Sequence, residues 1–266
     1  MGMFQERYGK KIGVSKLLAL SALATLAIAG ISQTTHAALV ASDNAGNSPY
    51  IPNASFSGQN GGLGFGAWSV TNNSGGNFIS NDNWGGITPW FDIYNDAGQQ
   101  TTATRPLDSV LSSGETLSFD LVLSSAQTGS SVGFFLGDSN NNGLFTFYQS
   151  GGGTFGNVVD NTGITSGVVA YNYHTVDQMA FTLTSATTYD FYVNNTLAHS
   201  GAISDATGGV AQLNFFDNNG GSNSDVQFTN LSINSTPLPA TFVFVLAGGI
   251  GMAAMGLNRR RSNIKA

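Results

Sequence analysis

The stretch TLSFDLVL, residues 116–123, decides the fold class of this 266-residue chain. Its apolar side chains stand at every second position: Leu117, Phe119, Leu121 and Leu123. Successive side chains of a β-strand point to opposite faces of its sheet, so this alternation predicts a strand with one buried face. Residues 179–183 and 189–193 alternate in the same way.

Other short apolar stretches lie on both sides of this one, separated by turns rich in Gly, Asn, Ser and Asp. Six of them are predicted strands: 67–71, 90–94, 132–136, 144–148, 210–216 and 226–233. In the last, the apolar phase slips between Phe228 and Leu231, which predicts a β-bulge. Asn194-Asn195 fits a two-residue hairpin turn, because asparagine tolerates positive φ.

The pattern of many short strands extends over residues 38–235, and no stretch there has a helical period. It predicts a single all-β domain, an antiparallel sandwich. We expect residues 38–62 to be an irregular lead-in to this domain. Residues 235–239 are expected to form a short linker after it.

Residues 1–37 have the pattern of a secretory signal peptide. Lys10, Lys11 and Lys16 precede an apolar run at 17–31, and small residues follow at Thr35 and Ala37. This order predicts cleavage by signal peptidase between Ala37 and Ala38. The alternative is an uncleaved membrane helix.

The C-terminal segment, 236–266, begins with the motif Pro237-Leu238-Pro239-Ala240. Residues 241–257 carry no charge and would span roughly 26 Å as a helix, enough to cross a thin bilayer. In the basic tail, 258–266, the cluster Arg259-Arg260-Arg261 would stay in the cytoplasm. A buried core helix and a plain membrane anchor are the alternatives.

This order of short motif, single apolar helix and arginine cluster resembles the PEP-CTERM sorting signal in its Pro-Leu-Pro-Ala variant. In that family an exosortase, a membrane-embedded cysteine protease, processes the protein near the motif. The resemblance implies an exosortase-type partner and a bacterial precursor anchored through 241–257. It also implies a mature domain in the cell envelope, at the cell surface or in the extracellular matrix.

The charge of the exported part is strongly negative. Residues 38–257 contain one cation, Arg105, against thirteen Asp and one Glu, a balance of −13. Such a surface repels nucleic acid and anionic lipid, whose binding requires Lys and Arg. The chain has no cysteine, which excludes disulfides and thiol catalysis.

Several stretches of the exported part are similar to the concanavalin A-like jelly roll of legume-lectin and laminin-G domains. They are residues 60–68, 104–107, 189–201, 213–216 and 230–233. The resemblance implies a jelly-roll sandwich and contact with carbohydrate.

A glycosidase of this fold would need two carboxylates flanking the scissile bond. Residues 38–235 have a single glutamate, Glu115, so the Glu-x-Asp-x-x-Glu strand of the glucanase branch is absent. A pair such as Asp177 and Asp190 remains open. His174 and His199 do not have the spacing of metal ligands, and there is no Gly-x-Ser-x-Gly nucleophile elbow. We therefore predict no catalytic residue.

The candidate carbohydrate contacts are three tryptophans and Arg105. Trp84 lies in a Gly/Asn-rich loop and is expected to be exposed, whereas Trp68 and Trp90 lie in predicted strands, where a core position is more typical. Arg105 either forms an ion pair, for which Asp92 and Asp108 are candidates, or binds a carboxylate of an acidic polysaccharide.

One segment matches the first half of an EF-hand calcium loop. Asp138, Asn140 and Asn142 offer oxygen donors at positions 1, 3 and 5, before Gly143 at position 6. Position 12 is Gln149 instead of Glu, and an Asn-rich turn explains the same residues. Calcium is the only cofactor that the sequence suggests.

Three functions remain in order of preference. The first is a non-catalytic exported protein of the cell envelope or of a biofilm matrix, associated with exopolysaccharide. The second is a lectin-like carbohydrate-binding module, and the third is a glycoside hydrolase.

If the C-terminal segment is a processed sorting signal, the mature protein in its host will lack residues 1–37 and everything after about Pro239. Intact-mass analysis of membrane, periplasmic and culture fractions measures this. We expect the shortened protein in the envelope or matrix. An intact 258–266 tail in the inner membrane would indicate a plain anchor instead.

Overall fold

The computed structural model describes residues 37–236, apart from 97, 125, 205–207, 220 and 222–223. The described residues contain fifteen β-strands and no helix, which confirms the all-β prediction. Accordingly, the described part of the chain has no helix long and apolar enough to cross a membrane. Residues 1–36 of the predicted signal peptide and the sorting motif with its helix and tail, 237–266, lie outside the described residues.

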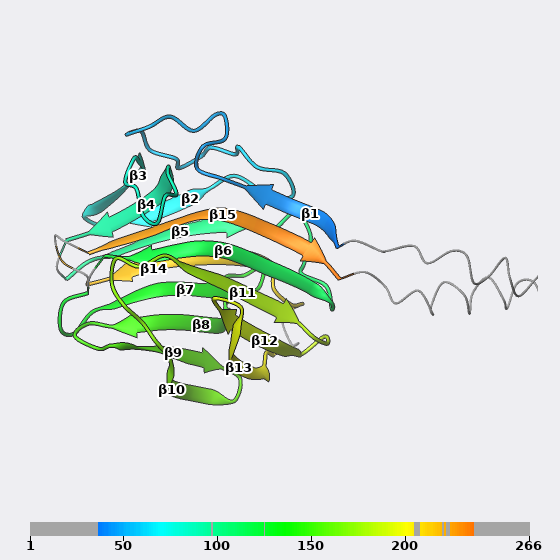
Figure 1. Cartoon of the computed structure of the whole chain (residues 1–266). Helices are drawn as coiled ribbons and strands as arrows, with labels where there is room; N and C mark the ends of the chain where they lie inside the picture. The colour runs from blue at the N-terminus through cyan, green and yellow to red at the C-terminus, as the bar shows by residue number, and fades with distance from the viewer. Residues whose placement is uncertain are drawn as a thin grey trace, which may run out of the picture. The chain divides into compact units, whose positions relative to one another are not determined.

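The strands form two antiparallel sheets (Figure 1). The larger sheet has the order β13 (Thr196–Ala202), β12 (Thr188–Val193), β11 (Asp177–Leu183), β6 (Glu115–Leu123), β15 (Asp225–Ser235), β4 (Trp90–Asn95) and β3 (Gly75–Ser80), with β1 (Ala38–Asp43) also paired to β15. The seven-stranded sheet has the order β10 (Gly163–Ala170), β9 (Phe155–Asp160), β8 (Gly143–Ser150), β7 (Ser131–Gly137), β14 (Gln212–Asn218), β5 (Gln100–Pro106) and β2 (Ser69–Asn72). The chain passes repeatedly from one sheet to the other, which gives a jelly-roll sandwich.

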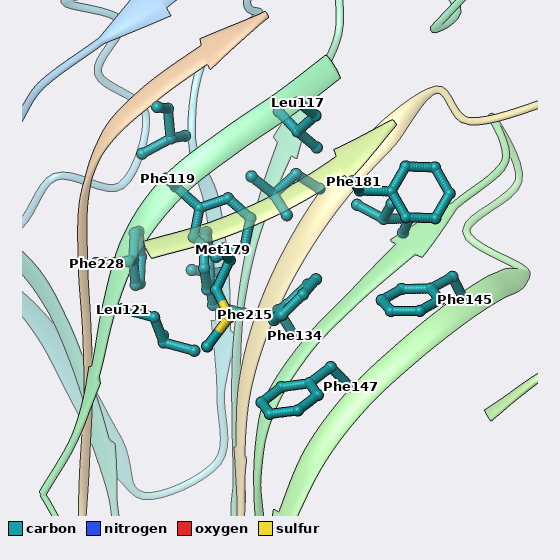
Figure 2. Close-up of a cluster of buried hydrophobic side chains, with 14 of the residues drawn as sticks. Leu117, Phe119, Leu121, Phe134, Phe145, Phe147, Met179, Phe181, Phe215 and Phe228 are labelled. Carbon is teal, nitrogen blue, oxygen red and sulfur yellow. The ribbon is translucent and has the colours of Figure 1, made fainter. Parts of the chain in front are cut away.

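The core lies between the two sheets, where inward aromatic rings meet (Figure 2). Phe119 of β6 packs edge-on against Phe134 of β7 and Phe215 of β14, with ring centres 4.8 and 5.0 Å apart. Phe215 also stacks on Phe228 of β15, with 3.6 Å between ring centres. Since β6 and β15 belong to one sheet and β7 and β14 to the other, these contacts join the sheets. The stretch 116–123 therefore supplies the centre of the core.

Two local predictions are confirmed. Asn194 and Asn195 have φ of 51° and 61° and connect β12 to β13 as a two-residue turn. In β15 the pairing with β6 shifts register between Thr229 and Ser232, which is the predicted bulge. Asn230 takes a φ of 54° within it.

The expectation of an irregular lead-in at 38–62 is wrong for its first residues. They form β1, which pairs with the C-terminal half of β15 and places Ala38 opposite Ser235. A register shift between Leu39 and Ala41 interrupts the alternation of side chains. Pairing with a strand far away in the sequence, and not local pattern, therefore determines this strand.

A buried ion pair connects β1 to the seven-stranded sheet. Nη2 of Arg105 on β5 lies 2.6 Å from Oδ2 of Asp43, and neither side chain is exposed. Nη2 also donates to Oδ1 of Asn60 at 2.7 Å, and the hydroxyl of Tyr50 donates to Asp43 Oδ2 at 2.6 Å. Burial lowers the pKa of Arg105, an effect that Asp43 opposes, and burial with the Asp43 contact raises the pKa of Tyr50.

This arrangement corrects two sequence-based expectations for Arg105. Its ion-pair partner is Asp43 and not Asp92 or Asp108. The guanidinium also lies over the ring of Trp68, 4.9 Å from its centre, as a cation–π contact. Because the side chain is fully buried, it cannot bind a polysaccharide carboxylate at the surface.

Replacing Arg105 with Met should lower the free energy of unfolding by about 3–5 kcal/mol, because Asp43 is left buried without its counter-charge. Urea unfolding of the full-length chain in detergent, followed by tryptophan fluorescence, measures the loss. The double variant Arg105→Met/Asp43→Asn should recover part of it, since no charge then remains in the pair. A loss below about 1 kcal/mol in the single variant, typical of exposed pairs, would contradict this account.

Candidate functional site

The outer face of the seven-stranded sheet carries no charged side chain among its described residues. Its strands contain three charged residues, Arg105, Asp160 and Asp217. Arg105 is in phase with the core residue Ala103 and Asp217 with the core residue Phe215, and both charged side chains are fully buried. Asp160 points to the same inner side, where it accepts a hydrogen bond from the hydroxyl of buried Tyr189 at 2.6 Å. The outward positions carry uncharged side chains, which are polar, aromatic or, at Val159 and Ile164, aliphatic.

Strand register brings these outward residues into adjacent rows. Phe135 of β7 lies opposite Asn214 of β14, which lies opposite Thr104 of β5. In the next row Phe216 lies opposite Thr102. The rings of Phe135 and Phe216 are 6.3 Å apart between centres and tilted by 45°. The face therefore presents aromatic rings beside hydroxyls, while Asn214 is fully buried and its Oδ1 accepts a hydrogen bond from the Thr104 hydroxyl at 2.7 Å.

Tyr148 of β8 adds a third partly exposed ring, in the row of Phe216. It lies opposite Gly133 of β7, and Gly133 lies opposite Phe216. Because Gly133 has no side chain, nothing projects from the sheet between Tyr148 and Phe216. Two strand spacings separate them, about 10 Å.

Beside the rings the face is hollowed by a depression of about 280 Å³. Its lining comes from β2, β5, β7 and adjoining turns: Thr71, Asn73, Gln100, Thr102, Thr104, Phe135 and Asn141. Hydroxyl and amide groups can each donate and accept hydrogen bonds, while the phenyl ring offers an apolar surface. This combination suits a polyhydroxylated ligand with an apolar face.

The sequence-based candidates did not include this face. A usable signal is present, since Phe135 and Phe216 are aromatic residues at the outward phase of strands whose inward phase is already apolar. Among the tryptophans proposed as sugar contacts, Trp68 is 1% exposed and Trp90 is fully buried, so both are core residues and these two candidates are corrected.

Trp84 is partly exposed, in the turn between β3 and β4 on the other sheet. Its Nε1 donates to Oε1 of Gln227, and its ring lies 5.3 Å from that of His174. Nε2 of Gln227 donates to Oδ2 of Asp82 and to Oδ2 of Asp92, each at 2.6 Å. Trp84 therefore covers a network of carboxyl groups.

Asp92 is the unusual member of this network. Burial, followed by the charges of Asp225 and Asp82, raises its pKa to about 8. Asp82 and Asp92 bond to the same nitrogen, so their carboxyl groups are close enough for glycosidase chemistry. However, Asp92 is only 1% exposed, and such chemistry requires both groups to reach a substrate.

The other carboxyl pair considered from sequence, Asp177 and Asp190, does not converge. Asp177 is in phase with the core residue Met179, whereas Asp190 alternates with the core residues Tyr189 and Phe191. The two carboxyl groups therefore point to opposite faces of the same sheet. This expectation is corrected by the alternation of the strands.

The calcium candidate is a hydrogen-bonded turn between β7 and β8. Oδ1 of Asp138 accepts from the backbone N–H groups of Asn140 and Asn142, at 2.9 and 2.8 Å. Its Oδ2 accepts from Nδ2 of Asn142 at 2.8 Å, so an amide nitrogen faces it instead of an oxygen. Asn141 takes positive φ in the turn. Over the described residues, no three His, Asp or Glu side chains converge as metal ligands.

No family model and no curated protein matches the chain. Solved structures are similar to it in fold. A sialidase aligns over 64% of this chain at 12% identity and a TM-score of 0.51, and the chain spans 17% of its length. The cellulose-induced protein Cip1 aligns over 64% of this chain and 92% of its own at 10% identity, with a TM-score of 0.48. The sialidase likeness shows a shared fold alone.

The pKa of Asp92 predicts that the domain loses stability as pH rises. Between about pH 4 and 8 the folded protein keeps the Asp92 proton while the unfolded chain releases it. The free energy of unfolding should therefore fall across this window, by up to about 1.4 kcal/mol per pH unit from this group. Burial also raises the pKa of Asp225, which acts in the same direction.

Urea unfolding of the full-length chain at pH 5 and pH 8 measures this slope. Asp92→Asn should reduce the slope and make the protein more stable than wild type at pH 8. Asp108→Asn, at an exposed position, controls for the loss of one negative charge. A slope that is the same in wild type and Asp92→Asn would contradict the assignment.

Proposed function

We propose that this chain is a non-catalytic, exported carbohydrate-binding protein of the bacterial cell envelope or extracellular matrix. The observation that carries the proposal is the hollowed, uncharged face of the seven-stranded sheet, with Phe135, Tyr148 and Phe216 beside hydroxyl and amide groups. The fold likeness to a sialidase supports a jelly-roll module of this kind only at the level of the backbone.

Two kinds of group on this face would make two kinds of contact with a sugar. The rings of Phe135 and Phe216 would pack on the apolar face of a pyranose ring. Thr102, Thr104 and Asn141, which line the hollow, would exchange hydrogen bonds with sugar hydroxyls. A shallow site of this size binds a single sugar weakly. A polysaccharide that contacts many copies of the domain at once is held more tightly through avidity.

Export and sorting form the second half of the proposal. The predicted signal-peptidase cut, between Ala37 and Ala38, falls at the start of β1. The motif beginning at Pro237 follows β15, which ends at Ser235. Both cuts would therefore release the folded sandwich without removing a strand. An exosortase-type enzyme would complete the second one and deliver the domain to the envelope or matrix, where exopolysaccharide is available.

Binding should depend on the rings of this face and not on the opposite sheet. We expect Phe135→Ala and Tyr148→Ala to weaken glycan binding by about tenfold or more, since truncated aromatic anchors commonly cost this much. Tyr192→Ala, at a partly exposed outward tyrosine of β12, is the matched control and should bind like wild type.

A glycan array probed with the full-length chain in detergent identifies ligands, and titration calorimetry then compares the variants. An array without binding to any glycan would exclude the carbohydrate-binding function. In that case the non-catalytic envelope role would have to be structural. Urea unfolding of each variant separates loss of binding from loss of fold.

A further inference from the structure

We infer that the glycan bound by the seven-stranded sheet is neutral: its sugar units at the face carry no carboxylate, sulfate or phosphate. This inference rests on the proposed function and specifies the class of ligand for the same site. It excludes the acidic polysaccharide that the lone arginine could suggest from sequence.

The first argument is the location of charge in the sheet. All three charged residues of its strands, Arg105, Asp160 and Asp217, are on the inner side. A sugar carboxylate on the outer face would lose hydration against hydroxyls, amides and rings. Without an opposite charge, that desolvation is not offset. A neutral sugar hydroxyl replaces its hydrogen bonds to water with hydrogen bonds to Thr102 or Asn141, and the net free energy changes little.

The second argument is the supply of cations in the whole exported part. Arg105 is the only Lys or Arg in residues 38–257, and Asp43 holds it in the interior. The two histidines of the described residues lie away from this face: His199 belongs to β13 of the other sheet, and His174 packs on Trp84. An anionic polymer would therefore approach a domain of charge −13 and find no cation to bind.

Calcium could in principle bridge an acidic glycan to acidic side chains. The described residues offer no convergent set of three carboxylates or histidines for such an ion, and the hollow is lined by uncharged groups. Calcium-dependent binding of an acidic glycan would therefore overturn the inference.

The test compares matched neutral and acidic ligands. Oligogalactose and oligogalacturonate of equal length are titrated into the full-length chain in detergent, with EDTA and separately with calcium. The full-length chain has eight further Lys and Arg outside residues 38–257, so binding at the face is taken as the part that is lost in Phe135→Ala. We expect this part to be at least about tenfold weaker for the uronate than for the neutral ligand under both conditions. Affinity for the neutral ligand should change little with salt, because no charges are paired in the complex.

Charge placed in the hollow should change this preference. Thr102→Lys should strengthen uronate binding several-fold and weaken binding of the neutral ligand. Thr71→Lys provides a second variant, at an exposed position of the same hollow. Gln178→Lys makes the same change in net charge on an exposed position of β11 in the other sheet, and should leave the preference unchanged.

The outcomes separate the two proposals. Uronate bound as well as the neutral ligand by wild type, and lost in Phe135→Ala, would overturn the neutral class while the carbohydrate-binding function stands. Uronate binding that appears only with calcium has the same meaning. No binding of any glycan on the array would overturn both. An equal gain of uronate binding in Thr102→Lys and Gln178→Lys would also count against the assigned face.

Discussion

The buried ion pair between Arg105 and Asp43 holds the N-terminal strand against the rest of the sandwich. It joins β1 of one sheet to β5 of the other, and Asn60 and Tyr50 add hydrogen bonds to it, although Nε of Arg105 has no partner among the described residues. These hydrogen bonds offset part of the cost of burying two charges. The same pair determines the chemistry of the surface. Because it places the sole Lys or Arg of residues 38–257 in the interior, this part of the chain has no Lys or Arg at its surface to bind a ligand.

The two sheets differ in which residue types stand at the inward and outward positions of their strands. On β6 of the larger sheet the inward positions are apolar, and the outward positions are polar at Ser118 and Asp120 but apolar and buried at Val122. The seven-stranded sheet instead has its three charged side chains on the inner side and leaves Phe135 and Phe216 partly exposed. Exposed aromatic residues gathered on one polar face are informative, whereas single ones are ordinary. The larger sheet also has an outward aromatic pair, Phe78 and Tyr94, with ring centres 6.0 Å apart. Among the described residues, the lack of charged side chains beside the rings is therefore what distinguishes the candidate binding face.

Features set by neighbouring residues could be predicted from the sequence. The alternation of 116–123, the Asn194-Asn195 turn and the bulge in β15 all depend on local pattern and backbone preference. Features set by distant pairing could not. Asp43 and Arg105 are 62 residues apart, and Phe135 meets Phe216 only because β7 pairs with β14. Trp84 was correctly placed in a loop, but its hydrogen bond to Gln227 also depends on topology.

The position of β15 has a consequence for how the domain acquires its fold. It is the last strand in the sequence, yet it lies between β6 and β4 in the larger sheet and also pairs with β1, the first strand. A chain made from the N-terminus forward cannot complete this sheet until residues 225–235 are available, although hairpins such as β12–β13 can form earlier. During synthesis the sheet stays divided between β6 and β4. The larger sheet is therefore completed only when almost all of the domain has been made, whereas the strands of the seven-stranded sheet are all available before β15.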